Sequence, residues 1–210
     1  MKVNSKVQES RKPGRPTVDR RDEILDAAQR LYERIGFEKT SIGDVARELG
    51  MSPANLYRSF SNRRAIDEAV AKRRLTVIED AAWRAARQAA SDPDAAMHAI
   101  AQVVLHEMRR VLFVDGHMNR LCAVASRERW PVVEQFLDGL RGAIRHILFE
   151  GQRAGRYCTA DVDAEADVIV RAMTPVWHPQ MIDIHRDDDL EAIASQLAAM
   201  VLRSLRQRVE

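Results

Sequence analysis

Cysteine is scarce in this sequence: its 210 residues include only Cys122 and Cys158, which lie far apart. A structural zinc site or a disulfide scaffold would need paired or clustered cysteines, and no Cys-x-x-Cys pair is present. We therefore expect two partly buried free thiols, because unpaired cysteine is among the most frequently buried residue types.

Long apolar runs are also absent. The longest stretch without Asp, Glu, Lys or Arg falls well short of the roughly 18 apolar residues that a membrane span requires. The N-terminus is polar and basic and lacks the apolar core of a signal peptide. We therefore expect a cytoplasmic protein with no membrane partner.

Enzyme signatures are missing as well. The chain contains no Gly-x-Ser-x-Gly, His-Glu-x-x-His, phosphate-binding loop or glycine-rich dinucleotide turn. The histidines at 106, 117, 146 and 178 are scattered without the spacing of metal ligands. We expect no catalytic residue, no metal and no cofactor.

Charge is distributed unevenly along the chain. Residues 1–74 hold 17 Lys+Arg against 11 Asp+Glu, whereas the remainder holds 16 against 20. This asymmetry favours a polyanion-binding module joined to a mildly acidic domain, although solvated charged faces alone are common. Residues 1–18 are basic, rich in proline and poor in apolar side chains, which predicts a flexible basic arm.

From Asp19 onward the apolar residues follow a helical period, and no segment alternates as a strand does. Glycines, prolines and capping residues divide the chain into about nine expected helices. Their approximate ranges are 19–35, 41–49, 53–60, 62–90, 94–113, 117–128, 131–154, 163–178 and 187–207. The sequence thus predicts an all-α protein.

The second and third expected helices form a helix-turn-helix pattern. Gly50 suits the tight turn between them, since glycine readily takes a left-handed conformation. Ser41 with Asp44 predicts a capping box, and Ser52 before Pro53 predicts a hydroxyl cap at the start of the third helix. The exposed face of the third helix then presents side chains that reach phosphates and base edges. These are Ser52, Ala54, Asn55, Tyr57 and Arg58.

The segment from Gly36 to Phe60 resembles the DNA-binding domain of the TetR family of transcriptional regulators. The matching features are Gly36-Phe37, Thr40-Ser41, Val45-Ala46, Gly50-Met51-Ser52 and Leu56-Tyr57-Arg58-Ser59-Phe60. The resemblance covers about residues 20–72. The Trp177-His178-Pro179 junction and Met51–Asn55 further resemble the AefR-like subgroup of that family.

The resemblance implies a homodimer that places two third helices in successive major grooves of double-stranded DNA. Their half-sites would lie about 34–36 Å or more apart, on a near-palindromic operator. Thr40, Ser41, Tyr57 and Arg63 are assigned mainly to phosphates, and Ser52 shares their face. Pro53, Ala54, Asn55 and Arg58 are assigned to base edges. Alternatively, the Tyr57 ring packs on the second helix, and Arg58 is a solvated surface arginine.

The arm carries a second motif. Arg11-Lys12-Pro13-Gly14-Arg15-Pro16 resembles an AT-hook core, in which an extended strand lies in a narrow A·T-rich minor groove. Arg11, Lys12 and Arg15 would make its contacts. The alternative is an unstructured basic tail that adds only nonspecific affinity.

The resemblance also implies that the C-terminal part encloses a ligand cavity and forms the dimer interface. The cavity candidates are Trp83, Met97, Val104, Met108, Phe113, Met118, Cys122, Leu140, Ile144, Ile147, Leu148 and Trp177. The dimer candidates are Ile169, Met173, Leu190, Ile193, Leu197, Met200, Val201 and Leu205. For both sets, ordinary intrachain core is the alternative.

The domain organisation that follows is a basic arm (1–18), a helix-turn-helix domain (19–65) and an effector-binding and dimerisation domain (66–210). The predicted function is a homodimeric transcriptional regulator, in the first place a repressor, released from its operator when a small apolar effector tilts the helix that starts near Asn62. One alternative is a DNA-binding regulator whose C-terminal domain docks a protein partner. Another is an enzyme with a vestigial helix-turn-helix. Repression and activation remain alternatives at this point.

Overall fold

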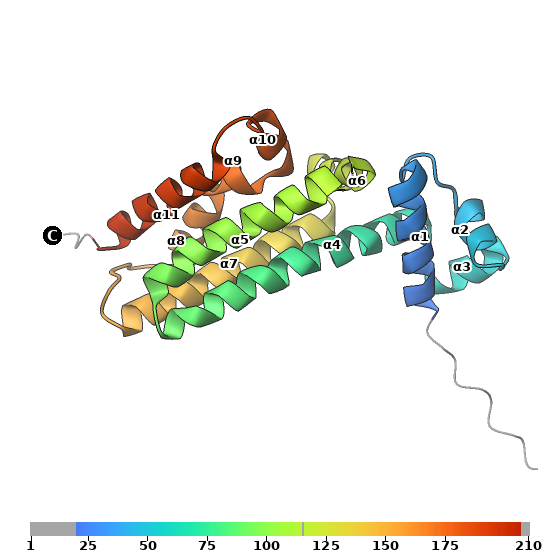
Figure 1. Cartoon of the computed structure of the whole chain (residues 1–210). Helices are drawn as coiled ribbons and strands as arrows, with labels where there is room; N and C mark the ends of the chain where they lie inside the picture. The colour runs from blue at the N-terminus through green and yellow to red at the C-terminus, as the bar shows by residue number, and fades with distance from the viewer. Residues whose placement is uncertain (1–19, 115, 207–210) are drawn as a thin grey trace, which may run out of the picture.

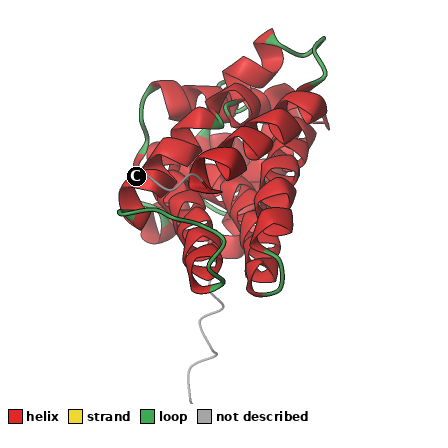
Figure 2. Cartoon of the chain, turned by 90° about the vertical axis from the view of Figure 1, so that its left-hand side faces the viewer, coloured by secondary structure: helices red, strands yellow, loops and turns green. Residues whose placement is uncertain are grey.

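A computed structural model describes residues 20–114 and 116–206, of which 111–114 and 116–119 are described by backbone alone. Within these ranges the chain forms helices and connecting loops, with no strand, as Figures 1 and 2 show. The helices are α1 (Arg21–Ile35), α2 (Ile42–Glu48), α3 (Pro53–Ser59), α4 (Arg63–Ala86), the short 3₁₀ helix η1 (Arg87–Ala90), α5 (Pro93–Val114), α6 (Gly116–Arg127), α7 (Pro131–Arg153), α8 (Val162–Ala172), α9 (Thr174–Trp177), α10 (Pro179–Ile184) and α11 (Leu190–Arg206). The all-α prediction is confirmed.

The first three helices form the predicted helix-turn-helix domain. The capping box at the start of α2 is present, with the Asp44 amide donating to the Ser41 hydroxyl at 3.1 Å and the Ser41 amide donating to Asp44 at 2.9 Å. Gly50 takes φ = 62° in the turn, as predicted. Ser52 precedes α3 without a capping hydrogen bond from its side chain, so that part of the prediction is wrong. Pro53 at the first helical position compensates, because its missing N–H needs no partner.

Helix α4 joins the two parts of the molecule, running from beneath α1 into the C-terminal bundle (Figure 1). Asn62 caps it, as predicted, by accepting the Ala65 amide at 2.9 Å. Helix α1 contacts both α4 and α6, so the helix-turn-helix domain also rests on the bundle. The domain boundary proposed after residue 65 falls inside α4, which therefore belongs structurally to both parts.

The bundle is built around α4, α5 and α7, with α11 packed on α5 and α8 packed on α7. Glycines allow α4 and α7 to approach closely. A Cβ at position 142 would meet the Trp83 ring at 3.1 Å, and one at 139 would overlap the Glu79 side chain. The core continues from α1 through this bundle as one cluster of buried apolar side chains.

One expected helix is wrong: residues 163–178 do not form a single helix. That range is divided between α8 and α9, and α10 forms in a segment where no helix was expected, so the described part contains eleven α-helices where about nine were expected. Pro175 and Pro179 explain the breaks, because each lies in the first turn of a new helix and cannot donate to the preceding one. His178 caps α10 by accepting the Gln180 amide at 3.3 Å.

No helix among the described residues combines the length and apolar character needed to cross a membrane. Both cysteines are free thiols, and only Cys122 is buried. The prediction of a partly buried Cys158 is wrong, because that residue lies in the exposed loop between α7 and α8.

Candidate nucleic-acid interface and effector cavity

The exposed face of α3 carries the side chains that were predicted to read DNA. Pro53, Ala54, Asn55 and Arg58 are exposed, together with Ser52 at the start of the helix. Tyr57 is 51% exposed, so about half of its surface is accessible to a partner.

Leu56, on the opposite face of α3, is 1% exposed and anchors the helix to the domain. No ion pair of Arg58 with another described residue is present. Helix α3 therefore offers an unobstructed polar surface at the tip of the molecule.

Two residues assigned to phosphates point inward instead. Thr40 is 2% exposed, and its hydroxyl donates to the Gly36 carbonyl at 2.8 Å. The Arg63 guanidinium donates to the carbonyls of Phe37 and Thr40, and to the Asp67 carboxylate at 2.9 Å. Neither side chain is placed to reach a phosphate, so the geometry does not support these two assignments.

Arg63 belongs to a polar network beneath the helix-turn-helix. The buried Tyr32 hydroxyl donates to Asp67 at 2.5 Å, and the Arg63 guanidinium lies 5.5 Å from the centre of the Tyr32 ring. Burial, reinforced by the Asp67 carboxylate, raises the pKa of Tyr32, so this hydroxyl remains a neutral donor. The network ties α1 and the loop before α2 to the first turns of α4.

The N-terminus of α2 presents a different surface. Ser41 is exposed, and its hydroxyl lies 2.6 Å from the Asp44 carboxylate. Hydrogen bonds from Ser41, followed by that from Arg47, lower the pKa of Asp44 to about 2. Lys39 is an exposed cation nearby that the sequence reasoning missed. Its position just before the capping serine of α2 is the signal that could have identified it.

The three arm residues, Arg11, Lys12 and Arg15, lie outside the described residues. Their assignment to the minor groove stays a prediction.

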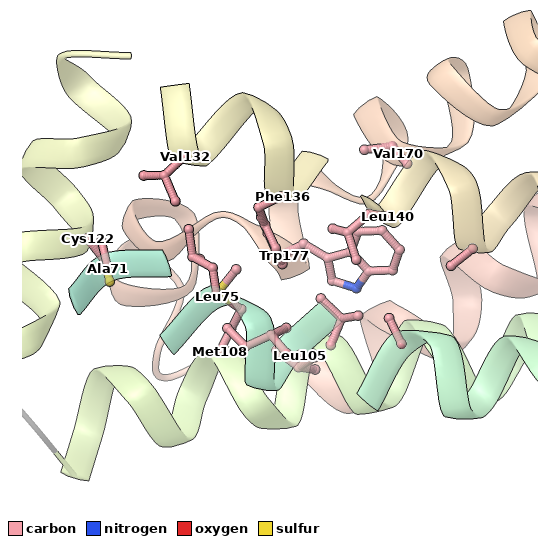
Figure 3. Close-up of a cluster of buried hydrophobic side chains, with 14 of the residues drawn as sticks. Ala71, Leu75, Leu105, Met108, Cys122, Val132, Phe136, Leu140, Val170 and Trp177 are labelled. Atoms are coloured by element: carbon pink, nitrogen blue, oxygen red, sulfur yellow. The ribbon is translucent and has the colours of Figure 1, made fainter. Parts of the chain in front are cut away.

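A cavity of about 310 Å³ lies inside the bundle, between α4, α6, α7 and the α8–α10 segment. Figure 3 shows apolar side chains from these helices and from α5 converging there, with Phe136 and Trp177 near the centre. The Trp177 indole N–H donates to the Ala101 carbonyl at 3.1 Å, which fixes the ring as one wall. The volume is at the lower end of the range for small-molecule sites.

The cavity candidates divide into three groups. Met108, Cys122, Leu140 and Trp177 line the cavity. Trp83, Met97, Val104, Ile144, Ile147 and Leu148 do not line it and instead pack between helices, which is a correction of those six assignments. The side chains of Phe113 and Met118 lie outside the described part. Burial raises the pKa of the Cys122 thiol to about 11, so this wall of the cavity is uncharged.

Sequence reasoning missed the polar part of the lining. The cavity also contacts Arg74, Ser126, Arg129, Glu134, Arg141, Arg171, Thr174 and His178. Burial lowers the pKa of His178, which favours the neutral imidazole. Because its Nδ1 accepts the Gln180 amide, the proton is assigned to Nε2. The His178-Pro179 junction was a signal for a cap, but nothing in the sequence placed it at a cavity.

A cluster beside the cavity connects it to the start of α4. The Arg64 guanidinium stacks 3.7 Å from the centre of the Trp130 ring and pairs with Glu68 and Glu128 at 2.9 Å each. The Trp130 indole N–H also donates to Glu128 at 2.9 Å. Two of these three partners of Arg64, Glu128 and Trp130, flank Arg129 in the α6–α7 turn. Arg129 itself lines the cavity. The cavity wall and the first turn of α4, which supports the helix-turn-helix domain, are therefore connected through one turn.

The dimer candidates are only partly available at the surface. Ile169, Met173, Leu190, Val201 and Leu205 are buried within the chain, so the intrachain-core alternative accounts for these five. Ile193 and Leu197 are partly buried and Met200 is 48% exposed. The spacing of these three places them on one face of α11. Val168 on α8, which sequence reasoning missed, is 58% exposed.

Two family models match the chain. Residues 24–70 match the model described as bacterial regulatory proteins, tetR family, and residues 93–198 match the tetracyclin repressor-like C-terminal domain. The chain is also similar to the HTH-type transcriptional repressor ComR of Escherichia coli (strain K12), with 39% identity over 67 residues. That match covers 32% of this chain and 31% of ComR, so it spans about a third of the relative's length.

Solved structures share the fold over most of the chain. A transcriptional regulator from Cytophaga hutchinsonii ATCC 33406 superimposes with a TM-score of 0.67 at 19% identity, covering 89% of this chain and 98% of that one. RolR in complex with resorcinol gives a TM-score of 0.57 at 20% identity, covering 88% and 86%. The two family models together extend from α1 into α11, and the chain therefore belongs to the tetR family of bacterial regulatory proteins.

Proposed function

We propose that this protein is a homodimeric transcriptional repressor that leaves a near-palindromic operator when a small, largely apolar ligand enters the bundle cavity. The proposal rests on one observation: α3 presents an exposed polar face, and a cavity in the bundle is lined in part by α4. Helix α4 joins the helix-turn-helix domain to that bundle. Repression, rather than activation, is supported by the printed name of the relative ComR.

DNA recognition is assigned to the exposed side chains of α3. Asn55 and Arg58 carry the donors and acceptors that pair with adenine and guanine edges in the major groove. Tyr57 is exposed on α3, and Lys39 and Ser41 are exposed just before α2. These three side chains supply phosphate contacts.

Release by a ligand requires that the ligand bind the non-DNA conformation more tightly than the DNA-bound one. Ala71, Leu75 and Ile78 on α4 line the cavity directly, so a ligand there changes the packing of α4. The turn that holds Arg64 offers a second connection to the same helix. We expect both to alter the spacing of the two α3 helices across the dimer.

A dimer is supported by the apolar face of α11 that the chain leaves partly uncovered. Met200→Asp places a charge there and is expected to dissociate the dimer, whereas Thr76→Asp on the exposed side of α4 is expected to leave it intact. Sedimentation equilibrium measures both. A Met200→Asp protein that remains a dimer would place the interface elsewhere.

The decisive experiment is footprinting on the DNA that flanks the coding region of this protein, at physiological salt. We expect a protected near-palindrome for the wild-type protein, lost in the Tyr57→Ala, Arg58→Ala double variant. Arg153→Ala, an exposed arginine on α7, serves as the matched control and should protect the same site. Steeply salt-dependent binding with no protected site, unchanged in the double variant, would mean nonspecific phosphate contact.

The second candidate function is a regulator whose C-terminal domain docks a protein. Ile184 and Phe149 are large exposed apolar residues, 70% and 59% accessible, on α10 and α7. The largely apolar cavity favours the small-molecule function, and RolR shows that a protein of the same fold was solved with resorcinol bound. Displacement of operator DNA by small molecules, without any added protein, separates the two functions.

A further inference from the structure

The charged residues of the cavity lining are predominantly basic. Arg74, Arg129, Arg141 and Arg171 contact the cavity, whereas Glu134 is the one acidic residue of the described lining. The rest of the wall is mainly apolar, including Phe136 and Trp177. A ligand that matches both features has an apolar body and a negatively charged end.

Three of these arginines are engaged by carboxylates that do not line the cavity. Arg141 pairs with Asp138 at 2.6 Å and with Asp167 at 2.9 Å, and Asp167 also accepts from Arg171 at 2.6 Å. Arg74 pairs with Glu33 on α1. These pairs hold the three arginines in place and offset much of their charge.

Arg129 differs from the other three. Its ion pair is with Glu134, at 3.6 Å, and both side chains are largely exposed, at 81% and 48%. An exposed pair of this length is weak, because water screens both charges. A carboxylate bound at the cavity mouth can therefore replace Glu134 as the partner of Arg129, with the two parallel hydrogen bonds that a guanidinium offers.

The backbone fixes the position of Arg129. Its φ of 52° lies in the left-handed region, where no other non-glycine residue of the described chain is found. Hydrogen bonds on both sides maintain the turn, from the Glu128 amide to Val124 at 2.9 Å and from the Trp130 amide to Ala125 at 2.9 Å. With the Arg129 amide donating to Ser126 at 3.2 Å, these bonds form the Schellman cap that ends α6, so the backbone at Arg129 is held at the edge of the cavity.

His178 adds a neutral donor to the same cavity. With its Nδ1 engaged by the Gln180 amide, its Nε2–H is the remaining polar group of the ring. A neutral N–H and a guanidinium together suit an anionic oxygen better than a cation or a purely apolar group.

We propose that the cavity binds an amphipathic carboxylate, whose apolar part packs against Phe136, Leu140 and Trp177 and whose carboxylate pairs with Arg129. The proposal rests on the cavity's being the effector site of the proposed function, and it specifies the chemical class of that effector. Because Glu128 and Trp130 hold Arg64, a carboxylate on Arg129 acts on the turn that supports the start of α4.

The test is calorimetric titration of the full-length protein without DNA, using pairs of ligands that differ only in charge. Hexanoate, octanoate and phenylacetate are each compared with the primary amide of the same skeleton. We expect at least one carboxylate to bind up to about fivefold more tightly than its amide, because Arg129 is exposed and its ion pairs are screened by water. No measurable preference for any carboxylate, including no binding at all, overturns the proposal.

Two variants with opposite expected effects locate the charge. Arg129→Gln should abolish the preference for the carboxylate, whereas Glu134→Gln should strengthen carboxylate binding by removing the competing partner. Arg153→Gln, exposed on α7 and absent from the cavity lining, should leave the preference unchanged. A preference that survives Arg129→Gln overturns the assignment.

Because the titrations contain no DNA, their outcome is independent of the footprint. Carboxylate binding without a protected operator would contradict the proposed function alone. A protected operator without carboxylate preference would contradict this inference alone.

Discussion

The polar network around Asp67 yields the sharpest prediction about stability. Asp67 accepts hydrogen bonds from the Tyr32 hydroxyl and from Arg63, and it is 7% exposed. Replacing Asp67 with alanine leaves the completely buried Tyr32 hydroxyl without its acceptor. The same change removes the ionic partner of Arg63, which retains its bonds to the carbonyls of Phe37 and Thr40.

The expected loss follows from these two contributions. A buried hydroxyl left without a partner costs about 1–3 kcal/mol. The Arg63–Asp67 pair adds only about 1 kcal/mol, because the arginine side chain is 31% exposed and therefore screened. We expect Asp67→Ala to lower the free energy of unfolding by about 2–4 kcal/mol. Tyr32→Phe removes the hydroxyl itself, so no buried donor is left without an acceptor, and Asp67 keeps its bond from Arg63. This variant should cost only about 1 kcal/mol.

Urea denaturation followed by far-ultraviolet circular dichroism measures both values, at one fixed protein concentration because the stability of the proposed dimer would depend on it. Asp26→Ala is the matched control: Asp26 also lies on an early helix and pairs with an α4 arginine, Arg73, at 2.6 Å, but it is exposed. The control should lose less than about 1 kcal/mol. If Asp67→Ala costs no more than Asp26→Ala, the buried network does not stabilise the domain more than an exposed ion pair does.

Two further predictions concern the cap of α2 and the end of α7. In the folded protein the Asp44 carboxyl should titrate near pH 2 instead of 3.8, so its stabilisation is complete above about pH 4 and is lost as the pH falls through 2. Carbon-13 NMR measures the midpoint, which Ser41→Ala should move back toward 3.8; an unchanged midpoint would contradict the assigned cause. Gly151→Ala places a Cβ 1.9 Å from the Tyr157 ring and should cost about 1–3 kcal/mol or more in thermal or urea unfolding. Gly155→Ala, which meets no neighbour, should cost about 1–2 kcal/mol through its left-handed backbone alone, and a larger loss there than at Gly151 would refute the steric argument.

Local features of the fold could be predicted from the sequence because their causes lie within a few residues. The capping box of Ser41 and Asp44, the left-handed Gly50 and the Asn62 cap each depend on one turn of chain. The division of residues 163–178 was missed, although Pro175 was visible. A helical apolar pattern continued across that proline, and the pattern does not report the change of axis between α8 and α9.

The candidate sites could be predicted only as far as helix faces define them. The face of α3 is exposed as expected, because Leu56 determines which side is buried. Arg63 turned inward because two backbone carbonyls from the loop before α2, those of Phe37 and Thr40, meet it from distant positions in the sequence, beside the local acceptor Asp67 on α4. No periodicity reports such a convergence.

The same limit applies to the cavity. Ile144 and Leu140 lie four residues apart on α7 and are both buried, yet only Leu140 contacts the cavity. An apolar stripe in the sequence predicts that a side chain is buried. Whether that side chain meets a cavity or another helix depends on how the helices cross. Arg129 and His178 were missed for a related reason, since polar residues at helix junctions are typical of caps and turns.

The placement of the three tryptophans gives the molecule its own optical readout. Trp177 forms a wall of the cavity, Trp130 lies under the Arg64 guanidinium at the base of the DNA-binding domain, and Trp83 packs against α7 at Gly142. Each indole therefore reports on a different part of the molecule: Trp177 on the cavity, Trp130 on the start of α4, and Trp83 on the contact between α4 and α7. In single-tryptophan variants, the emission spectrum of Trp177 would follow ligand entry and that of Trp130 would follow changes at the start of α4, without any attached dye.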